Sequence, residues 1–188
     1  MSGAPVLEQA GKLLLEPLQE ALVPSVLHSQ DAIQITYPNA QQDYRVGVFL
    51  YDLEEVRPYG TPPPIRVSDT QRRGPNRTFA LHFLVYANRK VPFDGMTALD
   101  EMLLLEAVMR AVHNFVPVEL EGETVTIQFD SLTRQEKATL WQSLSSPLQP
   151  AVYLVMEPLV VPSTKLERFI PVRQVQIKSN RKKEDTSP

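Results

Sequence analysis

Three histidines are the side chains best suited to acid–base or metal chemistry, and they lie far apart in the chain, at His28, His82 and His113. None of them belongs to a His-Glu-x-x-His motif or to another metal-ligand pair at helical spacing. We therefore interpret each of them as a structural histidine. We expect no metal site.

The acidic run at the end of a predicted strand is the next candidate for catalysis. Glu54 and Glu55 are adjacent, so on a strand their carboxylates point to opposite faces and cannot share a substrate. Asp52 and Glu54 share a face, but such a pair at a strand end is typical of solvated surface. No catalytic pair is predicted here.

Other enzyme chemistries lack the residues that they need. The chain contains no cysteine, which excludes disulfides, thiolate metal sites and thiol nucleophiles. It has only seven glycines, none of them clustered, and it contains neither a phosphate-binding loop nor a Gly-x-Ser-x-Gly motif. The sequence predicts a protein that is not an enzyme and that needs no cofactor.

Alternating apolar residues predict the strands that would hold these side chains, at residues 33–35, 44–53, 79–87, 124–129 and 151–157. Helical spacing predicts a helix from Val6 to Leu22, kinked or split at Pro17. Thr133 and Glu136 form a capping-box pattern at the start of a short helix that should turn Leu140, Trp141 and Leu144 inward.

The longest predicted helix begins at an Asp94 cap and ends near Phe115. Its apolar stripe should lie flat on a sheet and consists of Ala98, Met102, Leu105, Met109, Val112 and Val116. The fold class expected from these elements is α+β. We expect a single, mainly antiparallel sheet of four to six strands with helices packed on one face, plus an extended C-terminal arm.

Length and composition predict one folded domain with a tail. The 188 residues divide into a domain at 1–163, an extended arm or edge strand at 164–178 and a disordered polar tail at 179–188. No apolar run approaches the ~18–20 residues of a membrane span, and the N-terminus lacks the pattern of a secretion signal. We therefore expect the chain to fold in the cytoplasm.

Charge is unevenly distributed along the chain. Residues 57–90 hold seven Arg or Lys against one acid, a balance of +6, whereas residues 1–56 hold two against eight acids, a balance of −6. This asymmetry favours a head-to-tail contact between subunits, although solvated loop charge explains it equally well. A pI near 5.7 and the lack of interleaved aromatic residues argue against nucleic acid.

The order of these segments resembles one family, the cap or tail-terminator proteins of contractile, phage-tail-like injection systems, formerly a family of unknown function. The resemblance covers roughly Val6 to Ser163 and rests on five segments: Phe49–Glu55 before the Pro62-Pro63-Pro64 loop, Phe79–Ala87, Leu99–Asn114, Leu132–Leu144 and Val152–Ser163. The chain departs from the family pattern at Pro17 and in the basic run Gln71–Asn76. Because it stops at Pro188, we expect a minimal version of the family.

The resemblance implies a structural role without covalent chemistry. Such a protein would form a ring, expected to be a hexamer, at the distal end of the inner tube and the sheath, where it stops their growth and fixes tail length. Its partners would be further copies of itself and the tube and sheath proteins of the same particle, assembled in the cytoplasm. The alternatives are a baseplate or assembly adaptor of that particle, or a small enzyme with an unrecognised site.

Two groups of residues are candidates for the subunit contacts. The first is the basic loop, with Arg57, Arg66, Arg72, Arg73 and Arg77. The second is the weak strand pattern of the arm, with Val172, Val175 and Ile177. In contractile tails that the family resembles, such arms add a strand to a neighbouring sheet, and the alternative is an edge strand on the arm's own subunit.

Overall fold

The computed structural model describes residues 5–38, 40, 43–56, 63–90 and 96–169. The chain divides into two compact units, one formed by residues 1–61 and 76–162 and the other by residues 62–75 and 163–188. In chain order, the described elements are α1 (Val6–Leu22), a short 3-10 helix (Gln30–Ala32), β1 (Ile33–Ile35), β2 (Val46–Val56), β3 (Ile65–Arg66), β4 (Gln71–Arg73), β5 (Arg77–Ala87), α2 (Ala98–His113), β6 (Val118–Leu120), β7 (Glu123–Phe129), α3 (Arg134–Ser143), β8 (Ala151–Val161) and β9 (Leu166–Arg168).

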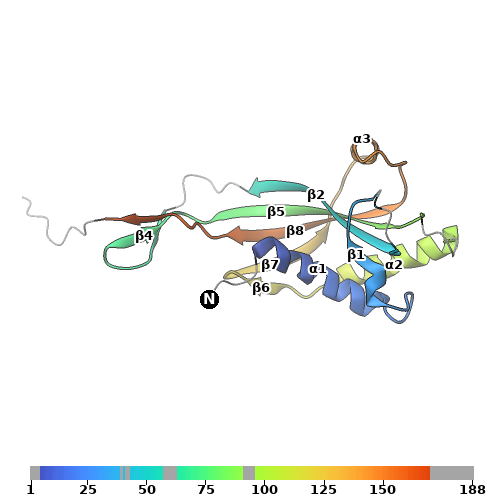
Figure 1. Ribbon diagram of the computed structural model, residues 1–188, viewed down its shortest axis with the longest axis horizontal. Coiled ribbons are helices and arrows are strands. Elements are labelled where there is room, and N and C mark those ends of the chain that lie inside the picture. Colours follow the sequence, from blue (N-terminus) through green and yellow to red (C-terminus); the bar gives the residue numbers. More distant parts are fainter. Residues whose placement is uncertain (1–4, 39, 41–42, 57–62, 91–95, 170–188) are drawn as a thin grey trace, which may run out of the picture. The chain divides into compact units, whose positions relative to one another are not determined.

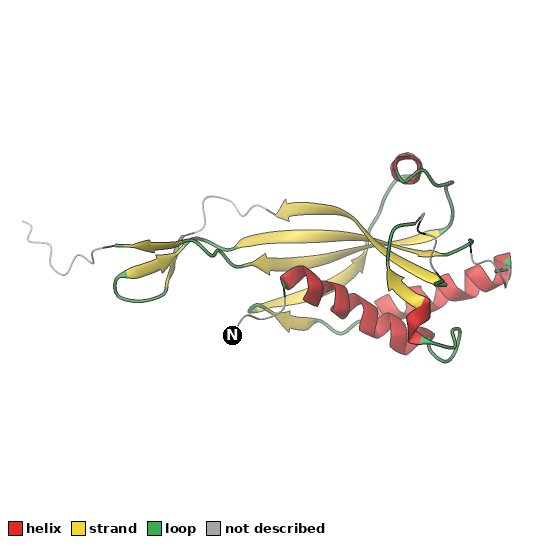
Figure 2. Ribbon diagram, viewed as in Figure 1, coloured by secondary structure: helices red, strands yellow, loops and turns green. Residues whose placement is uncertain are grey.

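The first unit is built on a six-stranded sheet with the order β1-β2-β5-β8-β7-β6 (Figure 2). Only β1 and β2 run parallel, and the other neighbours are antiparallel. The long strand β5 lies at the centre, paired with β2 on one side and β8 on the other. The expected α+β fold with a mainly antiparallel sheet is confirmed.

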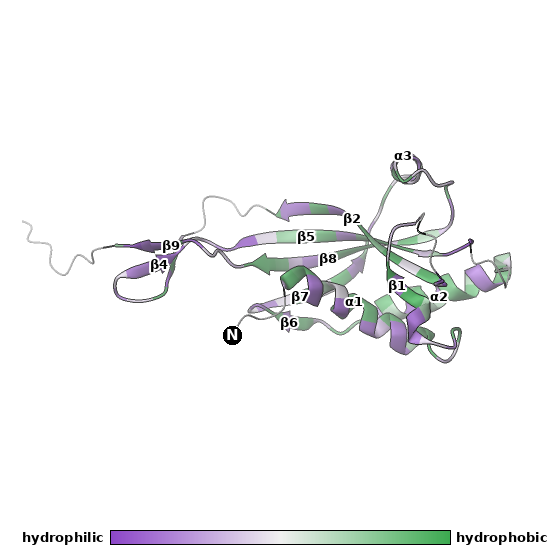
Figure 3. Ribbon diagram, viewed as in Figure 1, coloured by the Kyte–Doolittle hydropathy of each residue, from purple (hydrophilic) through white to green (hydrophobic). Residues whose placement is uncertain are grey.

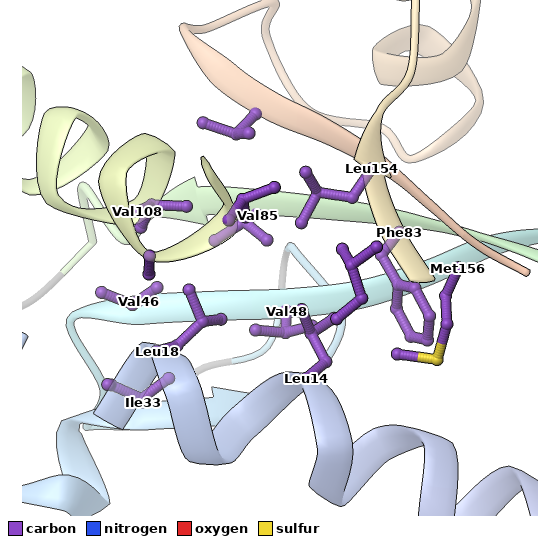
Figure 4. Packing of buried hydrophobic residues seen from close by; sticks show 14 of the residues in the cluster. Leu14, Leu18, Ile33, Val46, Val48, Phe83, Val85, Val108, Leu154 and Met156 are labelled. Atoms are coloured by element: carbon purple, nitrogen blue, oxygen red, sulfur yellow. The ribbon is translucent and has the colours of Figure 1, made fainter. Parts of the chain in front are cut away.

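One face of this sheet packs against α1 and α2, which lie on the same side of it (Figure 1). Leu14 and Leu18 of α1 and Val108 of α2 point toward the apolar side chains of β2, β5 and β8 (Figure 4). Apolar colouring follows the strands of this sheet, whereas β4 and β9 are polar (Figure 3). The main core therefore lies between the helices and the sheet.

The helix α3 lies on the opposite side of the sheet, over a second, aromatic cluster (Figure 1). Its only fully buried side chain among the described residues is Trp141, 1% exposed, whose indole N–H donates to the Tyr153 hydroxyl at 2.9 Å. The capping box of Thr133 and Glu136 begins this helix, as the sequence predicts. Both faces of the central strands are therefore covered.

The sequence predicts a kink or a split at Pro17, and the split is wrong, because α1 runs unbroken from Val6 to Leu22 with Pro17 inside it. A proline in a helix interior costs about 3 kcal/mol. The buried face of α1 outweighs this cost, since Leu14, Leu18 and Leu22 are all almost fully buried and each contributes about 1.5–3 kcal/mol.

The predicted apolar stripe of the long helix is correct only at Leu105 and Val112. The side chains of α2 that are buried are those of Glu101, Leu104, Leu105, Val108, Ala111 and Val112. Met102, Met109 and Val116 of the predicted stripe are exposed. The helix begins at Ala98 with a capping box of Thr97 and Asp100, while the expected cap Asp94 lies outside the described residues.

The buried face of α2 differs from the predicted one, and two substitutions test which face packs on the sheet. Met109→Ala should change the free energy of unfolding by about 0.5 kcal/mol or less, because its side chain is 44% exposed. Leu104→Ala should cost about 2–5 kcal/mol, since Leu104 is 2% exposed in the core. Urea unfolding of both variants measures the difference. A larger loss for Met109→Ala than for Leu104→Ala would mean that α2 packs through the predicted stripe.

The second unit contains structure where the sequence suggested an extended loop. Strands β3 and β4 form an antiparallel pair, and β9 adds to β4, which gives a three-stranded sheet with the order β3-β4-β9. The first residues of the predicted arm, Leu166–Arg168, therefore pair with Gln71–Arg73 of their own chain. Residues 170–188 lie outside the described part.

Candidate functional site

Most of the described arginines proposed for a subunit contact already form ion pairs within the chain. Arg57, Val172, Val175 and Ile177 lie outside the described residues. Arg66 forms an ion pair with Asp69 at 2.7 Å, and Arg77 forms one with Glu55 at the same distance. Arg73 buries its Nε, which has no hydrogen-bond partner among the described residues.

Arg72 is held in the second unit by two contacts. Its guanidinium lies 3.1 Å from the Glu167 carboxylate and 6.0 Å from the centre of the Phe169 ring. Lys165 approaches the same carboxylate at 2.9 Å, and together Lys165 and then Arg72 lower the pKa of Glu167. The second unit therefore neutralises part of its own positive charge.

A groove in the first unit gathers acidic side chains that are far apart in the sequence. It has a volume of about 1340 Å³ and is lined by α1, the segment from Ser25 to Ala32, residues 43–45 and α2. Five carboxylates and two guanidinium groups line it, those of Glu20, Asp31, Asp43, Asp100, Glu106, Arg45 and Arg110. We call it the acidic groove.

Local structure positions these acids in different ways. Asp100 is fixed by the capping box at the start of α2, where hydrogen bonds from Thr97 lower the pKa of its carboxyl. Glu106 pairs with Arg110 one turn further along the helix. Within the described part of the chain, Glu20, Asp31 and Asp43 have no ion-pair partner. The groove therefore keeps an excess of negative charge.

A second polar cluster lies on the α3 side of the sheet. The Asp130 carboxylate accepts hydrogen bonds from the Tyr51 hydroxyl and from Nδ1 of His82, both at 2.8 Å. Glu54 is further away, 3.8 Å from Nε2 of His82. His82 is thus hydrogen-bonded within the fold, and its interpretation as a structural histidine stays a prediction.

The partners of Asp130 decide how its carboxyl titrates. Burial alone would raise the pKa of Asp130, but the hydrogen bonds from His82 and Tyr51 outweigh burial and lower it. Burial, followed by the hydrogen bond to Asp130, raises the pKa of the Tyr51 hydroxyl. The three side chains link β2, β5 and the end of β7, and this arrangement fits a structural clamp.

Stability should therefore depend on pH through Asp130. The pKa of Asp130 is lower in the folded state than in the unfolded chain. Its carboxylate therefore stabilises the fold at pH values above the unfolded pKa of about 4, and this stabilisation is lost as the pH falls through the folded pKa. Asp130→Asn should flatten the acid side of a plot of melting temperature against pH. Asp52→Asn, which removes an exposed carboxylate from β2, is the control. An unchanged acid slope in Asp130→Asn would contradict this role.

Neither the groove nor the clamp was identified from the sequence. Asp130 and His82 are separated by 48 residues and meet only because β5, β8 and β7 are neighbours. The acidity of residues 1–56 was a signal for the groove, but α2 supplies two of its five carboxylates. In the described residues there is no group of three or more His, Asp or Glu that could hold a metal ion.

The chain is similar to known proteins in both sequence and fold. A model of the family described as the Pvc16 N-terminal domain matches residues 11–174. The PVC sheath/tube terminator of an extracellular contractile injection system, in its extended state, is similar with a TM-score of 0.65 and 16% identity, over 96% of this chain and 65% of that chain. The tube-terminating cap of the anti-feeding prophage is similar with a TM-score of 0.63 and 15% identity, over 92% of this chain and 61% of that chain.

The similarity is one of fold and covers part of those relatives. The chain spans less than two thirds of the length of either solved structure. No curated protein matches it. None of the described helices is long and apolar enough to cross a membrane. The family resemblance drawn from the sequence is confirmed by these matches.

Proposed function

The chain belongs to the Pvc16 N-terminal domain family, and from this premise we propose that it is a structural terminator of a contractile injection system tail. The single observation that carries the proposal is the match of 96% of the chain to the sheath/tube terminator, with a TM-score of 0.65. The role is a structural one, performed by binding surfaces rather than by a catalytic site.

The proposed mechanism is the geometry of a closed ring. Copies of the chain contact each other head to tail, and a heterologous contact whose rotation closes gives a ring instead of a filament. We propose six copies, placed at the distal end of the inner tube and the sheath. One face of the ring contacts the last layer, while the other face offers no site for another layer, so growth stops and tail length is fixed.

The charge distribution supports a heterologous contact. The acidic groove lies in the first unit, whereas the cations Arg66, Arg72 and Arg73 lie in the second. Opposite charges on different surfaces of one chain favour contact between unlike patches and disfavour contact between like ones. The candidate contacts of the basic loop and of Val172, Val175 and Ile177 remain part of this proposal.

Electron microscopy of particles that lack this protein tests the proposal. A terminator predicts tails of uncontrolled length, because nothing stops the addition of tube and sheath layers. Re-expression of the wild-type chain should restore a narrow length distribution. A baseplate or assembly adaptor predicts no tails at all, and that result would replace the terminator role. Tails of normal length and number would overturn both.

A further inference from the structure

The acidic groove has the chemistry of a site for a basic, partly apolar peptide. Its floor includes Leu104 and Ala111, which belong to the buried core, and its walls include the exposed side chains of Val26 and Leu103. An extended peptide could therefore bury apolar side chains against these walls. Its cations would meet the surrounding carboxylates.

The charge of the groove is available to such a partner. One of its two guanidinium groups, that of Arg110, is engaged by Glu106. The carboxylates of Glu20, Asp31 and Asp43 have no ion-pair partner in the described part of the chain, and all three residues are exposed. A cationic segment that binds here would not have to break an existing ion pair with these three side chains.

The chain itself contains a segment that fits this site. Residues 172–183 hold five Arg or Lys and no acid, and the apolar residues Val172, Val175 and Ile177 lie in the first half of this segment. The basic residues of the loop are poorer candidates, because Arg66, Arg72 and Arg77 already form ion pairs within their own chain. The charge and the apolar residues of the C-terminal segment therefore make it the best candidate in this chain for binding the acidic groove.

The segment is also long enough to leave its own subunit. Two residues, 170 and 171, separate it from Phe169, where the described part of the second unit ends. The 14 residues from 170 to 183 can span up to about 50 Å when fully extended.

We propose that the acidic groove of one copy binds residues 172–183 of a neighbouring copy. The proposal rests on the head-to-tail ring proposed above and names its donor and its acceptor. Each copy then gives one segment and receives one, which is the arrangement that a closed heterologous ring requires. Apolar contacts with Val26 and Leu103 would position the segment, and the carboxylates would select its charge.

Cysteine cross-linking tests this contact directly, because the chain has no cysteine of its own. Val26→Cys is placed on a full-length chain with one tag and Val175→Cys on a full-length chain with another. The two chains are mixed and oxidised, both in solution and in assembled particles. We expect disulfide-linked heterodimers that carry both tags.

Two controls separate this contact from its alternatives. Leu53→Cys has a similar exposure to Val26→Cys (42% against 39%) but lies on β2, whose pairing with β1 ends at Val48. Heterodimers with Leu53→Cys in place of Val26→Cys would indicate strand addition at the edge of β2, and would overturn the groove site. A single chain with both Val26→Cys and Val175→Cys that closes only on itself would show an intramolecular contact and would also overturn the proposal.

Charge reversal provides a second measurement on the full chain. A triple variant of the groove should reduce cross-linking at least tenfold at low salt, where surface charges are least screened. It combines Glu20→Lys, Asp31→Lys and Asp43→Lys. Replacement of Arg181, Lys182 and Lys183 by Glu in the segment should reduce cross-linking by a similar factor. Mixing the groove variant with the segment variant should restore cross-linking, because the charges are then opposite again. The same acid-to-Lys change at Glu119, Glu121 and Glu123, outside the groove, is the control and should leave cross-linking unchanged.

The result is distinguishable from failure of the terminator role. If particles are capped at normal length by the wild-type chain but no groove heterodimer forms in them, the groove contact is wrong and the terminator role stands. If deletion of the gene leaves tail length unchanged, the proposed function is wrong, whatever the cross-linking shows.

Discussion

Trp141→Ala is expected to lower the free energy of unfolding by about 3–5 kcal/mol, because it removes the centre of the aromatic cluster under α3. The indole is 1% exposed and stands edge-on to the Tyr86 ring, with 6.0 Å between ring centres. Few other side chains hold α3 to the sheet, since Leu140 and Leu144 are only partly buried. Urea unfolding followed by circular dichroism measures the loss.

Trp141→Phe separates packing from hydrogen bonding at this position. Phenylalanine keeps most of the apolar contact but lacks the N–H group that donates to the Tyr153 hydroxyl. We expect a smaller loss of about 1–3 kcal/mol, the cost of a buried hydroxyl left without its partner. Leu148→Ala, at a position that is 47% exposed after α3, is the matched control and should have little effect. A loss in Trp141→Ala no larger than in this control would mean that α3 does not pack on the sheet.

Much of the fold could be predicted from the sequence because apolar residues recur at every second position of its strands, even in β5, where Leu84 and Tyr86 on the other face are buried as well. The strand pattern of Val125 and Ile127 and the burial of Phe83 and Val85 follow directly from a period of two. The capping box of Thr133 was equally readable, since it depends on two side chains three residues apart. These signals are local, and tertiary contacts did not override them.

The face of α2 could not be predicted because apolar residues occupy two overlapping arcs of this helix. Leu105 and Val112 belong to both the predicted stripe and the observed one, so periodicity alone allows either rotation. The core selects the arc that includes Leu104 and Val108, where both side chains are almost fully buried. The choice depends on the surface of the sheet opposite, which helical spacing does not encode.

The acidic groove was hidden for a different reason. Its carboxylates come from α1, from the segment around Asp31, from Asp43 and from α2, and only the packing of α1 beside α2 brings them together. Residues 1–56 supply three of the five, so their acidity was a correct but incomplete signal. The position of a binding surface follows from topology, whereas the sign of its charge was visible in the sequence.

Truncation after Phe169 should abolish ring formation while leaving the fold intact. Strand β9 ends at Arg168, so the truncated chain keeps the β4–β9 pairing and the ion pair of Arg72 with Glu167. It loses Val172, Val175, Ile177 and all five cations of residues 173–183. We expect an almost unchanged melting temperature, a monomer in sedimentation velocity and tails of uncontrolled length in the particle.

A shorter truncation makes this experiment specific. Removal of residues 184–188 alone deletes two acids and leaves every cation and apolar residue of the segment in place. This control should therefore assemble as the wild type does, and the loss of its acids should not weaken binding to an acidic groove. A sharp fall in the melting temperature of the longer truncation would instead show that residues 170–183 stabilise their own subunit. In that case the C-terminal segment is part of the fold rather than a link between copies, and the exchange between subunits would be abandoned.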